Sequence, residues 1–265
     1  MKVWTLSIVA AAAAGCATAA DPVEATPSYL ALGDSVAFGF SPLVDLETQQ
    51  VTGYPELLAA RHGLEVTNLA CPGEASGGFV SSTGADNHCR ENRQAYPLHV
   101  SYEGTQLQAA LEHLRSTPNI QLVTIDLGAN DVFLLDHLCG RDLACILSNF
   151  VTTMADYNRN LDFILTQLRA VYDGPLVALT IYNPYPADRT AQFAIEKIDE
   201  ALAEKIVAHG GVVADGLTEF TSASNGDPCK AGLLIALPDG TCDVHPTPAG
   251  AEILADAIDA AMTLR

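Results

Sequence analysis

The chain has 265 residues, 49% of them hydrophobic, and is long enough to bury a sizeable core in one large domain or in two. Its formal net charge is −19, with 32 acidic residues against 13 basic ones. Such a surface repels phosphate backbones, which argues against nucleic acid as a partner. It argues equally against electrostatic docking on anionic lipid.

Residues 1–20 have the layout of a secretory signal peptide, with a basic residue at Lys2, then an apolar run and then small residues. The run is too short to span a membrane. Cleavage after Ala17-Thr18-Ala19 would give a secreted protein, extracellular or periplasmic. The segment Ala14-Gly15-Cys16 also resembles the end of a bacterial lipoprotein signal, so the alternative is cleavage before Cys16 and a membrane-anchored lipoprotein.

The cysteine count of seven becomes even once Cys16 is removed with the signal or lipidated. An even count in an exported protein favours disulfides. The other six cysteines fall in neighbouring couples, although other pairings stay open, and we expect these bonds: Cys71 with Cys89, Cys139 with Cys145, and Cys229 with Cys242. No Cys/His spacing indicates zinc, and no nucleotide-binding or H-E-x-x-H pattern is present, so no metal or cofactor is expected.

Strands and helices alternate along the rest of the chain, after a polar tether over residues 21–27. Apolar runs predict strands over residues 29–32, 64–70, 120–127, 176–182 and 212–214. Amphipathic or capped segments predict helices over 54–63, 105–114, 131–138, 143–172, 190–208 and 248–264. Two stretches show neither period and are expected to be irregular, residues 71–100 and the segment between Cys229 and Cys242.

This alternation predicts one α/β domain over residues 28–265. We expect a flavodoxin-like, three-layer arrangement with a mostly parallel sheet of about five strands and helices on both faces. A monomer is the default expectation. In such open sheets, ligands bind at the carboxyl ends of the strands.

A hydroxyl side chain follows the first predicted strand at that edge. The apolar run breaks at Gly33-Asp34-Ser35, which makes Ser35 a candidate nucleophile, although the triplet alone is also an ordinary turn. Acyl transfer by a serine further needs a base and donors for the developing oxyanion. Gly73 after the second strand offers a bare backbone N–H, Asn130 after the third offers an amide, and His245 lies directly before the last helix.

Together these segments resemble the SGNH/GDSL hydrolases, the esterase and lipase family whose four blocks are built around Ser, Gly, Asn and His. The blocks follow the family's order and span most of the chain, as Gly33-Asp34-Ser35, the Gly73 segment, Gly128-Ala129-Asn130-Asp131 and Asp243-Val244-His245-Pro246. Any single block is a weak motif. The absence of a Gly-x-Ser-x-Gly elbow counts against an α/β-hydrolase of that other type.

One position departs from the family's pattern. The family often has Asp three residues before the catalytic His, but here that position is Cys242 and Asp243 lies only two before. On a loop, Asp243 can turn back to the ring as the third triad member, or a backbone carbonyl can orient the imidazole instead. Asp34 and Asp131 both follow glycine-bearing turns, and we expect their carboxylates to bond local backbone.

The resemblance implies that Ser35 attacks an ester carbonyl with His245 as general base. The oxyanion would be held by the N–H groups of Ser35 and Gly73 and the amide of Asn130. The substrate would be a small-molecule or lipid ester. Alternatives are a carbohydrate O-acetyl esterase and an exported glycan- or lipid-binding domain with an idle serine. Apolar residues near the expected site favour an acyl chain over a sugar, unless they belong to the core: Phe38, Phe40, Phe79, Phe133 and Leu134.

Overall fold

The computed structural model of the chain describes residues 1–2, 26–140 and 142–263. Five parallel strands form the main sheet in the order β2-β1-β3-β4-β5. Their bounds are β1 (Ser28–Leu32), β2 (Glu65–Asn68), β3 (Ile120–Ile125), β4 (Leu176–Leu179) and β5 (Val212–Ala214). The predicted flavodoxin-like α/β fold is confirmed, and the sheet is parallel throughout. The signal peptide, the Cys16 alternative and most of the tether lie outside the described residues.

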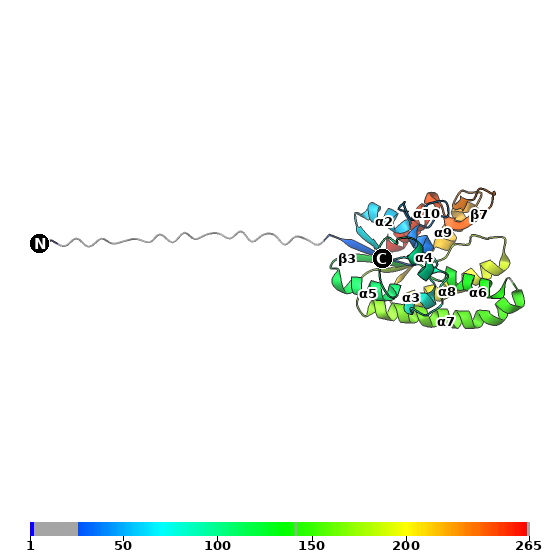
Figure 1. Cartoon of the computed structure of the whole chain (residues 1–265), viewed down its shortest axis with the longest axis horizontal. Coiled ribbons are helices and arrows are strands. Elements are labelled where there is room, and N and C mark those ends of the chain that lie inside the picture. Colours follow the sequence, from blue (N-terminus) through cyan, green and yellow to red (C-terminus); the bar gives the residue numbers. More distant parts are fainter. Residues whose placement is uncertain (3–25, 141, 264–265) are drawn as a thin grey trace.

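Helices cover both faces of this sheet (Figure 1). On one face lie α2 (Tyr54–His62), α9 (Gly216–Ser224) and α10 (Pro248–Thr263). On the other lie α5 (Gln106–Ser116), α7 (Leu143–Arg169) and α8 (Arg189–Ala208). The remaining helices are α1 (Ser35–Phe38), α3 (Ser76–Val80), α4 (Cys89–Ala95) and α6 (Ala129–Cys139). None of the helices in the described ranges is long and apolar enough to cross a bilayer.

Strand β1 explains why both faces of the sheet must be covered. All five of its residues are buried, and its side chains alternate between two clusters. Tyr29 and Ala31 pack in the core beneath α2 and α10, whereas Leu30 and Leu32 pack beneath α5 and α7. A strand that is apolar on both faces is stable only between two layers of helices. The carboxyl end of β1 therefore opens at a rim formed by both layers.

Both stretches expected to be irregular contain regular elements, and those two expectations were wrong. Residues 71–100 contain α3 and α4, and the later stretch contains β6 (Leu234–Ala236), which pairs antiparallel with β7 (Cys242–Pro246). No pattern in the residues indicated α9 either. These elements are too short to show an apolar period. Tertiary contacts and cross-links, rather than intrinsic propensity, therefore decide their conformation.

Three disulfides hold the segments around these short elements. The cysteines are joined in the expected neighbouring couples, Cys71–Cys89, Cys139–Cys145 and Cys229–Cys242. The first closes the segment that carries α3, the second links the end of α6 to the start of α7, and the third holds the start of β7. Closing loops of this size typically stabilises a folded chain by roughly 2 to 4 kcal/mol each.

Candidate active site

The turn after β1 presents Ser35 at the carboxyl edge of the sheet. Gly33 has φ 148°, and a Cβ there would lie 1.4 Å from Oδ1 of Asp126, so only glycine fits. The Asp34 carboxylate accepts a hydrogen bond from the Val36 N–H at 2.9 Å, the local bond expected for it, and so starts α1. The hydroxyl of Ser35 is the first side chain beyond that cap.

The histidine reaches this serine from the other end of the chain. Ser35 Oγ and His245 Nε2 are 2.8 Å apart, although 210 positions separate the two residues. His245 lies on β7, which is fixed at its start by the disulfide at Cys242 and in its middle by the Tyr182 hydroxyl, which donates to the Val244 carbonyl at 2.6 Å. The two residues expected to meet therefore do so at one rim.

Asp243 lies two residues before His245 instead of the three common in the family, and the strand β7 explains how this spacing can work. The sequence suggested a loop here, but Asp243 and His245 are on a strand, where residues two apart point to the same side. Asp243 Oδ1 accepts a 3.0 Å hydrogen bond from the His245 backbone N–H and is also paired with the ring at Nδ1. Burial acts to raise the pKa of Asp243, but its hydrogen bonds and the charge of His245 outweigh burial and hold that pKa below its usual value.

Gly73 and Asn130 are joined by a residue that the sequence did not single out. Asn87 donates from its backbone N–H to the Gly73 carbonyl at 2.8 Å and from Nδ2 to Asn130 Oδ1 at 2.9 Å. The fit at Gly73 is tight, since φ is 86° and a Cβ would lie 1.9 Å from the Asn87 carbonyl oxygen. The Asn130 amide then donates to Asp34 Oδ2 at 3.0 Å. No motif marks Asn87, because polar residues are common throughout its loop.

Asp131 has a structural role, as expected, but its main partner is distant in the chain. Its carboxylate accepts hydrogen bonds from the backbone N–H and the hydroxyl of Ser76, at 3.0 and 2.5 Å. Asp131 lies in the first turn of α6, and Ser76 begins α3. This contact fastens the segment after Gly73 to the helix that carries Asn130, so the two expected oxyanion donors belong to one connected unit.

The buried acids beneath the site form a close pair. Asp126 Oδ1 accepts a 3.1 Å hydrogen bond from the Asp34 backbone N–H, so the two carboxyl groups lie near each other in the core. Burial raises the pKa of Asp34 to about 6 even though hydrogen bonds from Val36 and Asn130 lower it. Burial and the charge of Asp34 also raise the pKa of Asp126 well above its usual value.

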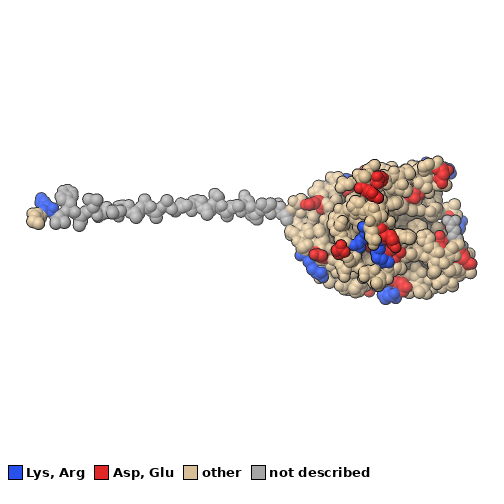
Figure 2. All heavy atoms as spheres, in the orientation of Figure 1, with Lys and Arg blue, Asp and Glu red and all other residues tan. Residues whose placement is uncertain are grey.

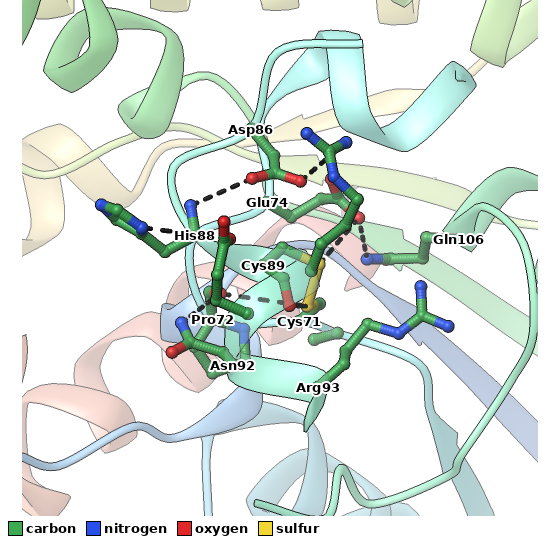
Figure 3. Close-up of a disulfide and its surroundings, with 12 residues drawn as sticks. Cys71, Pro72, Glu74, Asp86, His88, Cys89, Asn92, Arg93 and Gln106 are labelled. Carbon is green, nitrogen blue, oxygen red and sulfur yellow. Dashed lines mark hydrogen bonds and ion pairs between the residues drawn. A yellow bond between two sulfur atoms is a disulfide. The ribbon is translucent and has the colours of Figure 1, made fainter. Parts of the chain in front are cut away.

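Glu74 follows Gly73 in the chain, and its side chain lies beside the Cys71–Cys89 disulfide (Figure 3). It is 2% exposed, and burial together with the charge of Asp86 raises its pKa to about 8. Gln106 donates to it at 3.4 Å and also exchanges hydrogen bonds of 2.7 and 2.9 Å with the backbone of Gly33. Gln106 therefore ties the Ser35 turn to the Gly73 turn.

Among the described residues, one trio has spacing that would suit a metal ion, formed by Cys71, Glu74 and Cys89. The two cysteines are bonded to each other, so they offer no thiolate ligand. The third member, Glu74, has a carboxyl group that is neutral at pH 7, and a neutral carboxyl group is a poor metal ligand. These residues do not fit a metal centre.

Glu74→Gln is expected to make the free energy of unfolding less sensitive to pH between about 4.5 and 8. In the unfolded chain a glutamate ionises near its ordinary pKa of 4.5, whereas folded Glu74 holds its proton to about pH 8. The folded state therefore binds more protons between these values, and stability falls as pH rises through that window. Between pH 5 and pH 8 the free energy of unfolding of the wild type should fall by on the order of 3 kcal/mol more than that of the variant, as measured by thermal melts at both pH values. The exposed Glu91→Gln serves as control, and equal pH dependence of Glu74→Gln and wild type would contradict the assignment.

An apolar pocket of about 80 Å³ opens beside Ser35 and His245. Apolar side chains that line it include Val132, Phe133 and Ile195. It adjoins a groove of about 840 Å³. The two spaces share four lining residues, Val132, Phe133, Tyr185 and Ala191. The inner pocket is suited to an alkyl chain rather than to a charged group, whereas the groove has apolar side chains and three carboxylates, those of Asp136, Asp188 and Asp227.

The five apolar residues expected near the site separate into different roles. Phe133 lines both the pocket and the groove, and Phe40 packs on the His245 ring with centroids 4.7 Å apart. Phe38 and Phe79 are core residues, exposed by 2% or less, so they do not contact a substrate. Leu134 lines neither space. For Phe38 and Phe79 the core alternative therefore holds, and only Phe40 and Phe133 lie at the site.

Comparison with known proteins gives the family. Residues 31–253 match the model of the GDSL-like lipase/acylhydrolase family. No curated protein sequence matches the chain. Solved structures share its fold at low identity. An alpha/beta hydrolase enzyme from the metagenome of Lake Arreo, Spain, is 20% identical with a TM-score of 0.58, covering 90% of this chain and 96% of that one. A lipase from a goat rumen metagenome is 18% identical with a TM-score of 0.54, covering 89% and 97%.

An acetylxylan esterase from Geobacillus stearothermophilus is 14% identical with a TM-score of 0.52, covering 88% of this chain and 93% of that one. At these identities the structures establish a common fold and leave the substrate open. The family match carries more weight because it runs from the end of β1 into α10 and so includes every segment that meets at the rim. The chain belongs to the GDSL-like lipase/acylhydrolase family of hydrolases.

Proposed function

We propose that this protein is a serine esterase that hydrolyses carboxylic ester bonds through an acyl-enzyme. The observation that carries the proposal is the hydrogen-bonded series Ser35, His245 and Asp243, which opens on an apolar pocket. A serine becomes a nucleophile when an adjacent base, itself oriented by a third group, takes its proton. All three elements are in contact here. A binding domain with an idle serine has no need of this series.

The geometry supports the following reaction. Ser35 Oγ attacks the ester carbonyl while its proton passes to His245 Nε2, and Asp243 stabilises the imidazolium through Nδ1. The tetrahedral intermediate collapses, and His245 gives the proton to the departing alcohol. Water then attacks the acyl-enzyme with the same histidine as base, which releases the acid and restores the Ser35 hydroxyl.

The oxyanion of each tetrahedral intermediate would accept hydrogen bonds from three donors. These are the N–H groups of Ser35 and Gly73 and the Nδ2 amide of Asn130. In the described part of the chain no acceptor bonds the Gly73 N–H. Asn130 commits one amide proton to Asp34, and Asn87 fixes its carbonyl, so the second amide proton has a set direction. Donors held in place before the reaction lower the barrier most.

Asn130→Ala is expected to lower kcat by about 10² to 10³ with a much smaller change in KM, because an oxyanion donor acts mainly in the transition state. Asn158→Ala is a matched control, since Asn158 donates to the Met154 carbonyl within its own helix. Steady-state kinetics on a short p-nitrophenyl ester, with circular dichroism to verify folding, give both values. A folded Asn130→Ala enzyme with unchanged kcat would remove Asn130 from the oxyanion hole.

The experiment that tests the proposed function is an ester panel from acetate to palmitate, with phosphatidylcholine and acetylated xylan. The apolar pocket and groove favour acyl esters, so turnover should extend beyond acetate. The runner-up is a carbohydrate O-acetyl esterase, which the small size of the inner pocket keeps open. Activity on acetylated xylan alone would establish that alternative, and no hydrolysis of any ester would leave a binding domain.

Export from the cytoplasm is part of the same proposal. Disulfides persist in oxidising compartments, and the chain has three of them, Cys71–Cys89, Cys139–Cys145 and Cys229–Cys242. The secretory layout of residues 1–20 points the same way. A lipid anchor at Cys16 stays the alternative, and the mass of the exported protein's N-terminal peptide distinguishes the two.

A further inference from the structure

Large apolar side chains are exposed together at one corner of the molecule, beside the groove. This apolar corner is formed by α6, the start of α7, the β4–α8 connection and the start of α8. It lies at the end of the molecule away from the start of β1 (Figure 1). Its members and their exposed fractions are Leu138 70%, Leu143 53%, Leu147 58%, Val151 74%, Tyr185 47% and Phe193 46%.

These side chains form one continuous surface. Leu143, Leu147 and Val151 are four residues apart on α7, so they follow one side of that helix. The Cys139–Cys145 disulfide holds the end of α6, with Leu138, against the same turn. The rings of Phe150 and Phe193 are 5.4 Å apart, which joins α7 to α8, and Leu143 and Tyr185 line the same groove.

Within the apolar corner, the first part of α7 lacks charge in a strongly acidic protein, and the nearby charges are at helix ends, such as Asp142 and Asp188. The sequence has no Asp, Glu, Lys or Arg from Leu143 to Ala155, whereas 17% of the whole chain is charged. Elsewhere acidic side chains are dispersed over the surface, as the face in Figure 2 shows. Exposed apolar surface of this extent usually marks an interaction site. The uncharged stretch of α7 suits a partner surface without net charge.

The groove connects the apolar corner to the proposed nucleophile. Leu143 lines the groove alone, whereas Tyr185 and Phe133 line both the groove and the pocket that contains Ser35. An acyl chain that entered beside Leu143 would thus have apolar side chains along its path to the serine, although carboxylates also line the groove, those of Asp136, Asp188 and Asp227.

We propose that the apolar corner docks on a neutral or zwitterionic lipid surface, from which an ester's acyl chain passes along the groove to Ser35. The docking step stands by itself, whereas the delivery of substrate rests on the proposed function. Burial of apolar side chains in the lipid interface supplies the binding free energy. The net charge of −19 disfavours anionic surfaces.

A second copy of the chain fits the apolar corner less well than a lipid surface does. Leu143 and Tyr185 belong both to the corner and to the groove, so a protein seated there permanently would close the entry to the pocket. A lipid surface covers the corner and supplies the groove's occupant at the same time. The structure therefore assigns the corner to lipid.

The test measures sedimentation with phosphatidylcholine vesicles. All proteins carry Cys16→Ala, so that an attached acyl chain cannot supply binding, and Ser35→Ala, so that no lipid is consumed. The variant Leu147→Gln/Val151→Gln should bind vesicles more weakly than the parent, by at least about tenfold. The matched control is Leu43→Gln/Val207→Gln, because these side chains are exposed by 57% and 63% outside the apolar corner. The control should bind as the parent does.

Three outcomes would overturn the proposal. These are a parent that does not bind vesicles, an apolar-corner variant that binds as the control does, and a parent dimer in size-exclusion chromatography that the corner variant alone converts to monomer. With Ser35 restored, the ratio of vesicle-ester to soluble-ester turnover should also fall about tenfold in the corner variant. Vesicle binding without hydrolysis of any ester would instead refute the proposed function and leave the docking intact.

Discussion

Ser35→Ala and His245→Ala should each lower kcat on a short p-nitrophenyl ester by about 10⁴ to 10⁶, leaving folded proteins with little activity. Ser35 supplies the atom that bonds to the acyl group, and His245 moves its proton, so neither step has a substitute among the groups in contact with them. Because the two residues act as one unit, the double variant should be hardly less active than either single one.

Ser116→Ala controls for the loss of a serine. The Ser116 hydroxyl bonds to the carbonyls of Glu112 and His113 in its own helix. The Ser116→Ala variant should therefore match the wild type in activity and melting temperature. Thermal melts of the Ser35 and His245 variants separate lost chemistry from lost folding. A well-folded Ser35→Ala protein that retained a tenth or so of its activity would exclude Ser35 as the nucleophile.

Asp243→Asn has the second largest expected effect, about 10⁴ in kcat. The amide keeps the shape of the carboxylate but cannot stabilise the imidazolium, and it favours the wrong tautomer of His245. The side-chain hydrogen bond that lowers the pKa of Asp243 below its usual value also keeps the carboxylate charged well below neutral pH. The variant should therefore lose activity at every pH above that value rather than shift its optimum.

Asp239→Asn is the matched control for this carboxylate. Asp239 lies near the same hairpin, and its side chain bonds only the backbone and hydroxyl of Thr241. Steady-state rates of both variants across a pH series distinguish the two interpretations of the spacing. Activity of Asp243→Asn within about tenfold of wild type would mean that a backbone group, and not this carboxylate, orients the imidazole.

The sequence was sufficient to predict the sheet and its edge. The buried run of β1 and the alternation of strands with helices are encoded locally, in apolar periods that depend on neighbouring residues. The parallel order then brings the ends of β1, β2 and β3 together without further information. The fold is confirmed for that reason, and Ser35, Gly73 and Asn130 lie where those strand ends meet. Their catalytic roles stay predictions.

The contacts that orient these residues could not be predicted from the sequence. Asn87, Gln106 and Asp126 act on residues far from them in the chain, through hydrogen bonds that no spacing encodes. The two-residue spacing of Asp243 and His245 was ambiguous because the alternation in β7 covers only five residues, ends in a proline, and is too short to identify a strand. Its conformation depends on pairing with β6 and on the disulfide at Cys242.

Labelling with a fluorophosphonate tests the central claim most directly, since the reagent reacts only with a serine whose proton is taken by a neighbouring base. The account predicts one adduct per chain, located by mass spectrometry on the peptide that contains Ser35 and missing from His245→Ala. No adduct on the folded protein, or the same adduct in Ser35→Ala, would contradict it.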